Sequence, residues 1–350
     1  MVKWLSKNKK GIANFLLLAV IISITYYVLL RGKDIDKVIE AIRQADTMYV
    51  WLGIASMFIF IALEAVIIKY LMKNLGEDVK FLSCLKYSMI GFFFSNVTPS
   101  ASGGQPMQVI YMKRDGIDVS YSSLILLIIT VFYKFVIVLM GVVLLLFQYD
   151  FLTAHLEDSS MRYLFYFGIG ANIIVILGFF IIIFMKKTTK VIVGLTLKLI
   201  MNLKVIKNKQ ELKKKVLTSL ARYQKGAEYY KKNKKVLFNV FWITILQRCA
   251  MFVVTYFIYK GFGLSEYNVF QIIMLQCMIA ITVDILPFPG GAGISESCFM
   301  SIFEKLFGEY LILPAIMMFR GITYYLYLII SGAVLCYAQI FRNKDAEELG

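Results

Sequence analysis

Residues 96–106 read NVTPSASGGQP and directly follow a segment of aromatic and aliphatic residues. A second stretch, PFPGGAGISE at residues 287–296, interrupts another apolar segment, and the two stretches together hold four of the chain's five prolines. Proline stops a helix, whereas glycine permits positive φ angles and the close backbone approach that a sharp reversal needs. Both stretches therefore predict a break at which a helical segment turns back.

The composition predicts an integral membrane protein. The chain has 350 residues, of which 59% are hydrophobic, and its mean hydropathy of +0.72 lies far above that of soluble domains. A bilayer-spanning helix needs about 20 predominantly apolar residues. Six runs meet this length, at about 12–30, 48–72, 121–148, 161–185, 236–260 and 310–340. Two shorter apolar runs, about 81–97 and 268–286, lead into the two broken stretches.

The distribution of charge predicts the topology. Lysines near the N-terminus and in the segment 186–235 place both in the cytoplasm, because cytoplasmic loops carry an excess of Lys and Arg. The loop 149–160 has three acids and no Lys or Arg, so we expect it outside. These points require residues 81–113 to enter and leave on the cytoplasmic side, and residues 268–307 to do so from outside. Each broken stretch then lies at the tip of a re-entrant hairpin.

The predicted fold class is an all-α integral membrane protein with about six full transmembrane helices plus two re-entrant helical hairpins in an inverted-topology repeat. The first membrane repeat covers residues 1–160 with its hairpin at about 81–113, and the second covers 161–350 with its hairpin at about 268–307. Paired Gly/Pro-interrupted segments in corresponding positions of two inverted halves indicate a transport site near the midplane. We expect a multi-pass protein of a bacterial plasma membrane with both termini in the cytoplasm.

Most of the net charge of +16 comes from one segment. Residues 186–235 contain sixteen Lys or Arg and two acids, a net charge of +14. Their apolar residues recur every three or four positions, at Leu212, Val216, Leu220, Tyr223, Ala227 and Tyr230, which predicts a basic amphipathic helix. Such a helix fits the surface of an anionic leaflet, although charge that merely sets the topology explains it equally well. No nucleic-acid recognition motif accompanies the basic residues.

Irregular backbone at membrane depth persists only where protein or a water-filled cavity satisfies its polar groups. The residues suited to this task are Ser95, Pro99, Gly103, Gly104, Pro106, Pro287, Pro289, Gly290, Gly291 and Gly293. Ser and Thr side chains nearby, such as Thr98 and Ser102, can bond freed backbone groups. Helices that begin after the glycines would point N–H donors into the membrane centre and favour an anion there. The alternative is that the breaks are structural hinges filled by neighbouring helices.

Ionisable residues within apolar segments are functional candidates by default. Three cations and three carboxylates occur there: Lys134, Arg248, Arg320, Glu64, Asp284 and Glu296. One hypothesis is that the cations hold a lipid phosphate, which a guanidinium can bind through two hydrogen bonds. The other is that the six residues form structural ion pairs. A weaker candidate is the spacing Asp115-Gly-Ile-Asp118, which could hold a divalent ion but is equally typical of a turn.

The two motifs resemble those of a known family. The pattern Ser95-x-x-x-Pro99-x-x-x-Gly103-Gly104-x-Pro106, followed by Pro287-x-Pro289-Gly290-Gly291-x-Gly293-x-x-Glu296, is similar to the membrane domain of lysylphosphatidylglycerol synthase, the multiple peptide resistance factor. The resemblance covers about residues 12–340. It implies a domain that flips aminoacylated phosphatidylglycerol to the outer leaflet, where positive charge repels cationic antimicrobial peptides. The 350 residues leave no room for the family's soluble aminoacyl-transferase domain, so we expect the stand-alone translocator form.

We therefore expect a flippase-like phospholipid translocator without a cofactor, a metal or a catalytic residue. Its expected partners are membrane phospholipids, anionic or aminoacylated, and further candidates are a separate lipid synthase and a second copy of the chain; nucleic acid is not expected. Two alternatives remain open. One is a membrane-embedded lipid transferase, a phosphatidylglycerol lysyltransferase by family name, that uses Asp115, Asp118, Asp284 or Glu296. The other is an accessory subunit of a separate lipid synthase.

Overall fold

The computed structural model describes residues 34–156, 159–201, 209–284, 286 and 288–347, together with Ser23 and Tyr27. Apart from Ser23 and Tyr27, the first predicted span, at about 12–30, lies outside the described residues, as does Pro287. The described ranges contain no β-strand, and most of their residues lie in helices: α3 (Ile35–Gln44), α4 (Thr47–Asn74), α5 (Phe81–Val97), η1 (Pro99–Ala101), α6 (Gly104–Arg114), α7 (Val119–Phe147), α8 (Tyr149–His155), α9 (Ser159–Phe184), α10 (Lys186–Met201), α11 (Lys209–Lys232), α12 (Lys234–Gly261), α13 (Val269–Val283), η2 (Pro289–Gly291), α14 (Ile294–Arg320), η3 (Gly321–Leu326) and α15 (Tyr327–Glu347).

The all-α membrane class is confirmed. Among the described residues, five segments are long and apolar enough to cross a bilayer: Thr47–Asn74, Val119–Phe147, Ser160–Phe184, Lys234–Gly261 and Pro289–Gln339. Large apolar side chains such as Trp51, Leu146 and Ile174 are exposed on these segments, as expected where lipid covers the surface. The last segment is not one straight helix, because Gly308 breaks α14 with a φ of 71°.

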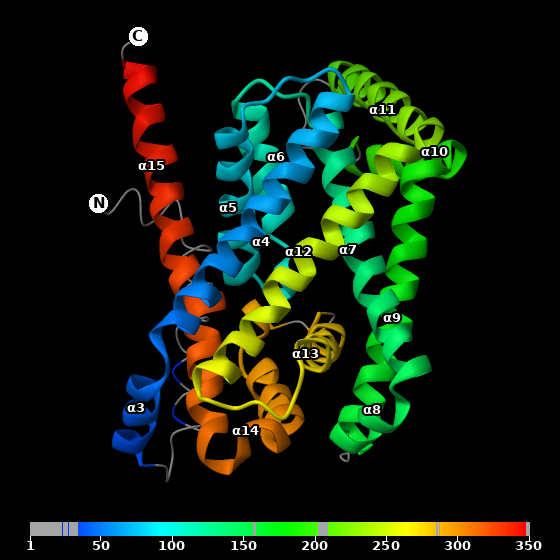
Figure 1. The fold of residues 1–350 in the computed structure, drawn as a ribbon. Helices are drawn as coiled ribbons and strands as arrows, with labels where there is room; N and C mark the ends of the chain where they lie inside the picture. Colours follow the sequence, from blue (N-terminus) through cyan, green and yellow to red (C-terminus); the bar gives the residue numbers. More distant parts are fainter. Residues whose placement is uncertain are drawn as a thin grey trace.

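Both predicted breaks are confirmed as reversals of the chain. Helices α5 and α6 pack against each other and are joined by η1, while α13 and the start of α14 are joined by η2. Figure 1 shows α5 and α6 in the upper part, at the same end as α10 and α11, and α13 and α14 in the lower part, at the same end as α3 and α8. The two turns contact each other inside the bundle. The re-entry of these hairpins from opposite leaflets and the inverted repeat remain predictions.

Helices α4 and α12 pack against each other in the centre of the bundle. Their contact includes hydrogen bonds from the Ser56 hydroxyl to the Ala250 carbonyl (2.7 Å) and from Gln247 Nε2 to the Phe60 carbonyl (3.3 Å). Close packing and hydrogen bonds of this kind drive helix association in lipid, where apolar burial adds little. Helix α4 also packs against α5, and α12 packs against α13, so this central pair contacts both hairpins.

The described residues of the basic segment lie mainly in α10 and α11, and the apolar side of the second half of α11 faces the protein. Ala227 and Tyr230 are buried, and the Tyr230 hydroxyl donates a 2.7 Å hydrogen bond to the Leu71 carbonyl. Arg222 forms an ion pair with Asp118 at the start of α7. The expectation that this stripe meets the leaflet is therefore wrong for the second half of α11, because the periodicity does not distinguish lipid from protein as the apolar partner.

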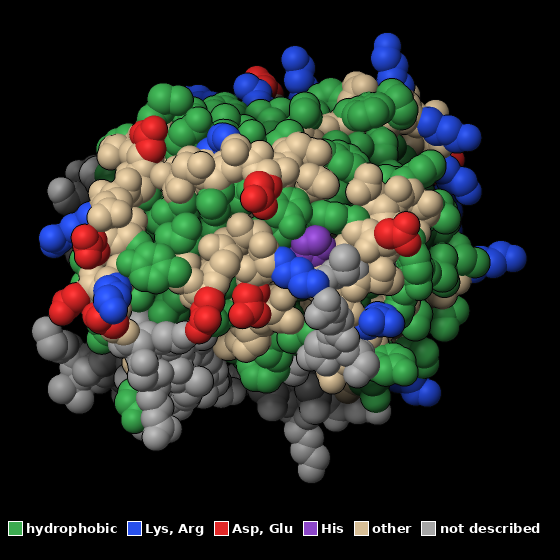
Figure 2. All heavy atoms as spheres, turned by 60° about the horizontal axis from the view of Figure 1, so that its bottom comes forward, with side chains coloured by type: hydrophobic (Ala, Val, Ile, Leu, Met, Phe, Trp, Pro, Cys, Tyr) green, Lys and Arg blue, Asp and Glu red, His purple; other side chains and the backbone are tan. Residues whose placement is uncertain are grey.

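The two ends of the bundle differ in charge. Acidic side chains gather on the lower face, which Figure 2 turns toward the viewer. Exposed acids on the elements of this end include Asp36, Glu40, Asp150, Glu304 and Glu309. The lysine-rich helices α10 and α11 lie at the opposite end (Figure 1). This asymmetry follows the charge distribution from which the topology was predicted.

Candidate functional site

The two turns share one pattern of φ angles. Each begins with a proline, Pro99 or Pro289, at the first position of a 3₁₀ turn, and two residues with positive φ follow it. In η2 these residues are Gly290 (φ 57°) and Gly291 (φ 67°), which is the usual choice for this conformation. In η1 they are Ser100 (φ 51°) and Ala101 (φ 52°), so the first turn holds two non-glycine residues in a strained region.

Gly103 and Gly104 let the two arms of the first hairpin approach each other. A Cβ atom on Gly104 would lie 2.0 Å from Ser95 Oγ, and one on Gly103 would lie 2.6 Å from the Thr98 side chain. The Thr98 hydroxyl donates to the Phe94 carbonyl (2.6 Å) and accepts from the Gly103 amide (2.8 Å). The prediction that polar side chains satisfy the broken backbone is confirmed for Thr98. Pro106 follows in the first turn of α6, where an amide N–H is not needed.

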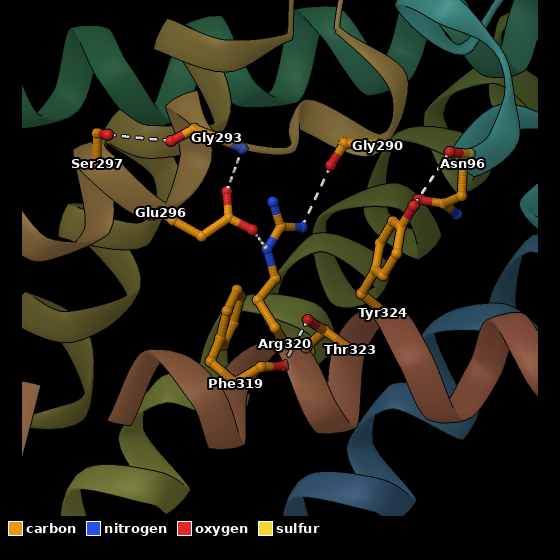
Figure 3. A network of polar contacts seen from close by, with 9 residues as sticks. All are labelled: Asn96, Gly290, Gly293, Glu296, Ser297, Phe319, Arg320, Thr323 and Tyr324. Carbon is orange, nitrogen blue, oxygen red and sulfur yellow. Dashed lines mark hydrogen bonds and ion pairs between the residues drawn. The ribbon is translucent and has the colours of Figure 1, made fainter. Parts of the chain in front are cut away.

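Glu296 and Arg320 form a buried ion pair behind the second turn (Figure 3). Arg320 Nε donates to Glu296 Oε1 at 2.7 Å, and Arg320 Nη1 donates to the Gly290 carbonyl at 3.2 Å. The other carboxylate oxygen of Glu296 accepts the Gly293 amide at 2.7 Å. Arg320 thereby ties the turn to the end of α14, and its Nη2 is buried without an acceptor among the described residues.

This pairing corrects one expectation about the helix N-termini. Helix α14 does begin after the glycines, with Gly293 (φ 88°) before its first residue. The Glu296 side chain folds back and occupies this end of the helix, so it is not an open anion site. The prediction is wrong here because Glu296 lies in the first turn of the same helix and its carboxylate accepts the hydrogen bond of the free Gly293 amide.

Lys134 and Asp284 form a second ion pair between the two halves of the chain. Lys134 Nζ also donates to Asn172 Oδ1 at 3.0 Å, and the Tyr133 hydroxyl donates to Asp284 Oδ1 at 2.6 Å. Asp284 directly follows α13, at the approach to the second turn. The network therefore joins α7, α9 and the second hairpin at one point.

Arg248 differs from the other two cations, because it forms no ion pair or hydrogen bond with a described residue. Its guanidinium lies against the rings of Tyr133 (4.3 Å to the centroid) and Phe60 (4.7 Å), and its Nε is buried without an acceptor. The carboxylates of Glu64 and Asp284 act on it electrostatically from a greater distance. Two aromatic faces thus hold the guanidinium in place and leave its N–H groups available to a ligand.

Glu64 accepts a hydrogen bond from Gln108 and has no cation within ion-pair distance among the described residues. Gln108 Nε2 donates to Glu64 Oε1 at 2.8 Å, and Gln108 is buried on the returning arm of the first hairpin. A Cβ atom on Gly91 would lie 2.4 Å from this amide group, so Gly91 makes room for it. The contact places a carboxylate of α4 against the first hairpin.

A cavity of about 260 Å³ lies where the two turns meet. Arg248, Asp284 and Arg320 line it, so three of the six predicted charges share one space. Lys134, Glu64 and Glu296 are not among the lining residues; Lys134 and Glu296 form ion pairs with lining residues. Polar groups from both hairpins and from η3 complete the wall: Ser95, Asn96, Ser100, Gln276, Ser295 and, from η3, Tyr324.

Two amide side chains at the site were not found from the sequence. Asn172, which bonds Lys134, and Gln108, which bonds Glu64, each stand in an apolar or short helical segment. The rule that singled out charged residues inside apolar runs applies to amides as well, and Asn172 within the run 161–185 would have met it.

Asp115 and Asp118 lie outside the cavity and are paired with protein groups. Asp115 accepts from Lys86 and Tyr87, while Asp118 begins α7 and forms an ion pair with Arg222. Both carboxylates already form ion pairs with cations of the chain. This geometry therefore gives the divalent-ion hypothesis no support.

Comparison with known proteins adds the family. A model of the lysylphosphatidylglycerol synthase transmembrane region matches residues 13–331. The chain is similar to a UPF0104 membrane protein of Pyrococcus horikoshii, with 24% identity over 326 residues that cover 91% of this chain and 96% of that protein. A UPF0104 membrane protein of Archaeoglobus fulgidus is 28% identical over 88 residues, 25% of this chain and 27% of that protein.

Proposed function

Because the chain belongs to the family of the lysylphosphatidylglycerol synthase transmembrane region, we propose that it is a lipid translocator that moves a polar headgroup between leaflets. The path would run through the cavity between the two turns, where the chain offers polar groups at the centre of an otherwise apolar bundle. Such groups are costly inside a membrane and are retained where they line a transport pathway.

The observation that carries this proposal is the state of Arg248. Its guanidinium lines the cavity, lies against two aromatic rings and has no ion-pair partner among the described residues. A phosphate group can accept two parallel hydrogen bonds from a guanidinium, which makes an anionic headgroup the natural ligand. Nη2 of Arg320 is likewise buried without an acceptor among the described residues. Lys134 and Arg320, by contrast, are neutralised by Asp284 and Glu296.

The size of the cavity favours a headgroup rather than a whole lipid. Its volume of about 260 Å³ is smaller than the roughly 300–1,000 Å³ of pockets that enclose a complete drug-sized ligand. Acyl chains would stay in the bilayer while the headgroup alone leaves water. A glycerophosphate or an aminoacylated glycerophosphate headgroup meets these requirements, since both carry the phosphate that Arg248 would bind.

The charge of the headgroup decides what must drive its transfer. For a lipid with net positive charge, a potential that is negative inside opposes outward movement by about 2.3 kcal/mol per charge per 100 mV. A net flux of aminoacylated lipid would therefore need a coupled ion or continuous removal of the product. Its arrival in the outer leaflet would add positive charge there and so contribute to resistance against cationic peptides.

The alternative of a membrane-embedded transferase finds less support. The four carboxylates named for it, Asp115, Asp118, Asp284 and Glu296, all have cationic partners within the chain. A general base needs a carboxylate that is available to substrate. Within the described ranges, no specific contact favours the accessory-subunit hypothesis over transport.

Leaflet exchange in proteoliposomes tests the proposal. Fluorescent phosphatidylglycerol, lysyl-phosphatidylglycerol, phosphatidylethanolamine and a polyprenyl phosphate are incorporated separately, and a membrane-impermeant reductant reports the fraction reached in the outer leaflet. We expect exchange of at least one phosphate-bearing lipid. We expect Arg248→Gln to slow it roughly 10- to 100-fold, the equivalent of about 1.5–3 kcal/mol for a hydrogen bond to a charged group.

Arg114→Gln is the matched control, because Arg114 also lies over a tyrosine ring (4.5 Å from the Tyr111 centroid) but at the end of α6, outside the cavity. Its exchange rate should equal that of the wild type. The absence of exchange for every lipid class would defeat the translocator, while equal rates for wild type and Arg248→Gln would defeat the site.

A further inference from the structure

A second cavity lies at the lysine-rich end of the bundle, between the α9–α10 junction and α11. It measures about 400 Å³ and is lined by Ile183, Phe184, Gln224 and Ala227 together with Lys186, Glu228, Lys231 and Lys232. None of these residues lines the cavity where the two turns meet, which we call the central cavity. The wall thus combines apolar and cationic side chains, a combination that a lipid headgroup and its adjoining chain segment would match.

Side-chain contacts fix the shape of this cavity. Gln224 Nε2 donates to the Lys186 carbonyl (3.2 Å), and Lys186 Nζ forms an ion pair with Glu228 Oε2 (2.7 Å). The Thr189 hydroxyl donates to the Ile182 carbonyl (2.7 Å) across the bend between α9 and α10. The cavity is therefore part of a defined junction between three helices rather than a gap beside a loose segment.

Helix α10 exposes an apolar face next to the cavity. Val191, Leu195 and Leu199 recur every four residues and are 60%, 60% and 70% exposed. Exposed lysines flank this face, among them Lys187, Lys190 and Lys198. Aliphatic residues on one side and lysines beside them are typical of a helix that lies in the interface of an anionic leaflet.

The charges of the cavity leave a cationic excess. Glu228 is shared by Lys186 and Lys232, with its second oxygen 3.1 Å from Lys232 Nζ. Lys231 has no carboxylate partner among the described residues, although it lines the same cavity. Positive charge beside exposed apolar surface favours an anionic lipid over a nucleic acid, since a nucleic acid would gain nothing from the apolar face of α10.

We propose that α10 and α11 form an anionic-phospholipid binding site, separate from the transport cavity, in the leaflet that borders the lysine-rich end. Val191, Leu195 and Leu199 insert among the acyl chains, and Lys186, Lys231 and Lys232 hold the phosphate of one headgroup over Ile183 and Phe184. The site does not depend on transport, because none of its residues lines the central cavity.

Tryptophan quenching by brominated lipids tests this site. Leu195→Trp is reconstituted in phosphatidylcholine nanodiscs with increasing fractions of brominated phosphatidylglycerol or brominated phosphatidylcholine, and the chain without this substitution gives the background from its native tryptophans. We expect brominated phosphatidylglycerol to reach half-maximal quenching at a roughly tenfold lower mole fraction, because each lysine near the surface favours anionic lipid several-fold.

Variants separate a defined site from a diffuse basic field. The triple substitution Lys186→Gln, Lys231→Gln and Lys232→Gln should bring the two lipids within about twofold of each other. Lys231→Gln alone breaks no ion pair with a described carboxylate and should weaken the preference without disturbing the junction. The control, Lys213→Gln with Lys214→Gln and Lys225→Gln, removes the same charge from exposed positions of α11 outside the cavity and should keep the preference.

Three results would overturn the proposal. Equal quenching by both brominated lipids would show that the site does not select anionic headgroups. An equal loss of preference in the control triple variant would replace the site with a general electrostatic field. No quenching by either lipid would show that α10 does not lie at the bilayer.

Discussion

The hydroxyl group of Tyr324 donates a 3.2 Å hydrogen bond to the carbonyl oxygen of Asn96, which joins the segment after α14 to the last turn of α5. The ring of Tyr324 also packs against Gly290, where a Cβ atom would lie 2.4 Å from it. Tyr324 thus contacts both hairpins at the point where their turns meet (Figure 3). It stands within a π-helical stretch, Gly321–Leu326, and such stretches frequently occur at functional sites.

We expect Gly290→Ala to destabilise the protein. The substitution places a methyl group into the Tyr324 ring and a non-glycine residue at φ 57°, effects worth about 1–3 kcal/mol for overpacking and about 1–2 kcal/mol for the backbone. Thermal unfolding of the detergent-solubilised protein measures the change. Gly178→Ala is the control, because nothing lies within 4 Å of its added Cβ and alanine is the better helix former by about 1 kcal/mol. Equal melting temperatures for the two variants would contradict the close contact.

Glu296→Gln is expected to cost about 3–5 kcal/mol, because it leaves the Arg320 guanidinium buried without its counter-charge. The side chains of the pair are only 7% and 3% exposed, so solvent cannot compensate. Adding Arg320→Met to Glu296→Gln should restore part of the melting temperature, since no uncompensated charge then remains. A double variant that is less stable than Glu296→Gln would show that Arg320 has a role in the fold beyond this pair.

Ser100→Gly should stabilise the protein slightly. Ser100 adopts a φ of 51°, which costs a non-glycine residue about 1–2 kcal/mol, against about 0.5–1 kcal/mol for the greater freedom of glycine in the unfolded chain. Ser102→Gly is the opposite case, because Ser102 has a φ of −66° and its hydroxyl donates to the Pro99 carbonyl at 2.8 Å. Chemical unfolding should rank Ser100→Gly above the wild type and Ser102→Gly below it, and the reverse order would contradict the turn geometry.

The junction of α10 and α11 should resist acid until well below neutral pH. Hydrogen bonds and ion pairs with Lys186 and Lys232 lower the pKa of Glu228 from 4.5 to about 2. A group whose pKa is lowered in the folded state stabilises that state above its ordinary pKa and loses this effect as the pH falls toward the folded value. The contribution of Glu228 is therefore complete above about pH 4.5 and disappears toward pH 2.

Spin labels at Thr196→Cys on α10 and Ala221→Cys on α11, in a chain without its native cysteines, report this junction. We expect one distance between pH 8 and pH 5, and a broader, longer distribution as the pH falls below about 4.5. Glu228→Gln should show the broad distribution already at pH 7. A transition between pH 6 and pH 7 would contradict the account, since no shift of Glu228 leads into that range.

The sequence predicted the two chain reversals closely, because proline and glycine act locally. Predicted limits of 81–113 and 268–307 compare with α5–α6, which ends at Arg114, and with a second hairpin that runs from Val269 to the break at Gly308. Candidate charges were also found locally, since an ionisable residue within an apolar run is visible without a structure. Their bilayer placement, the inverted repeat and the bacterial plasma membrane remain predictions.

The pairing of these charges could not be predicted, because it depends on tertiary contacts between distant residues. Lys134 and Asp284 are 150 residues apart in the sequence, and nothing in either segment indicates its partner. The sequence likewise could not show that Arg248 is the cation left without a partner. The surface that the apolar stripe of α11 contacts was mispredicted for a similar reason, since the same apolar periodicity fits a lipid surface and a protein surface.

The central claim is that the two turns enclose a polar, water-accessible space inside the membrane. Cysteine accessibility tests it most directly, with Ser95→Cys on the cavity wall and Phe135→Cys on the exposed side of α7, in a chain whose five native cysteines are replaced. We predict that a charged, membrane-impermeant thiol reagent labels Ser95→Cys and leaves Phe135→Cys unlabelled in proteoliposomes. Ser95→Cys that resists the reagent from both sides of the membrane would contradict the account.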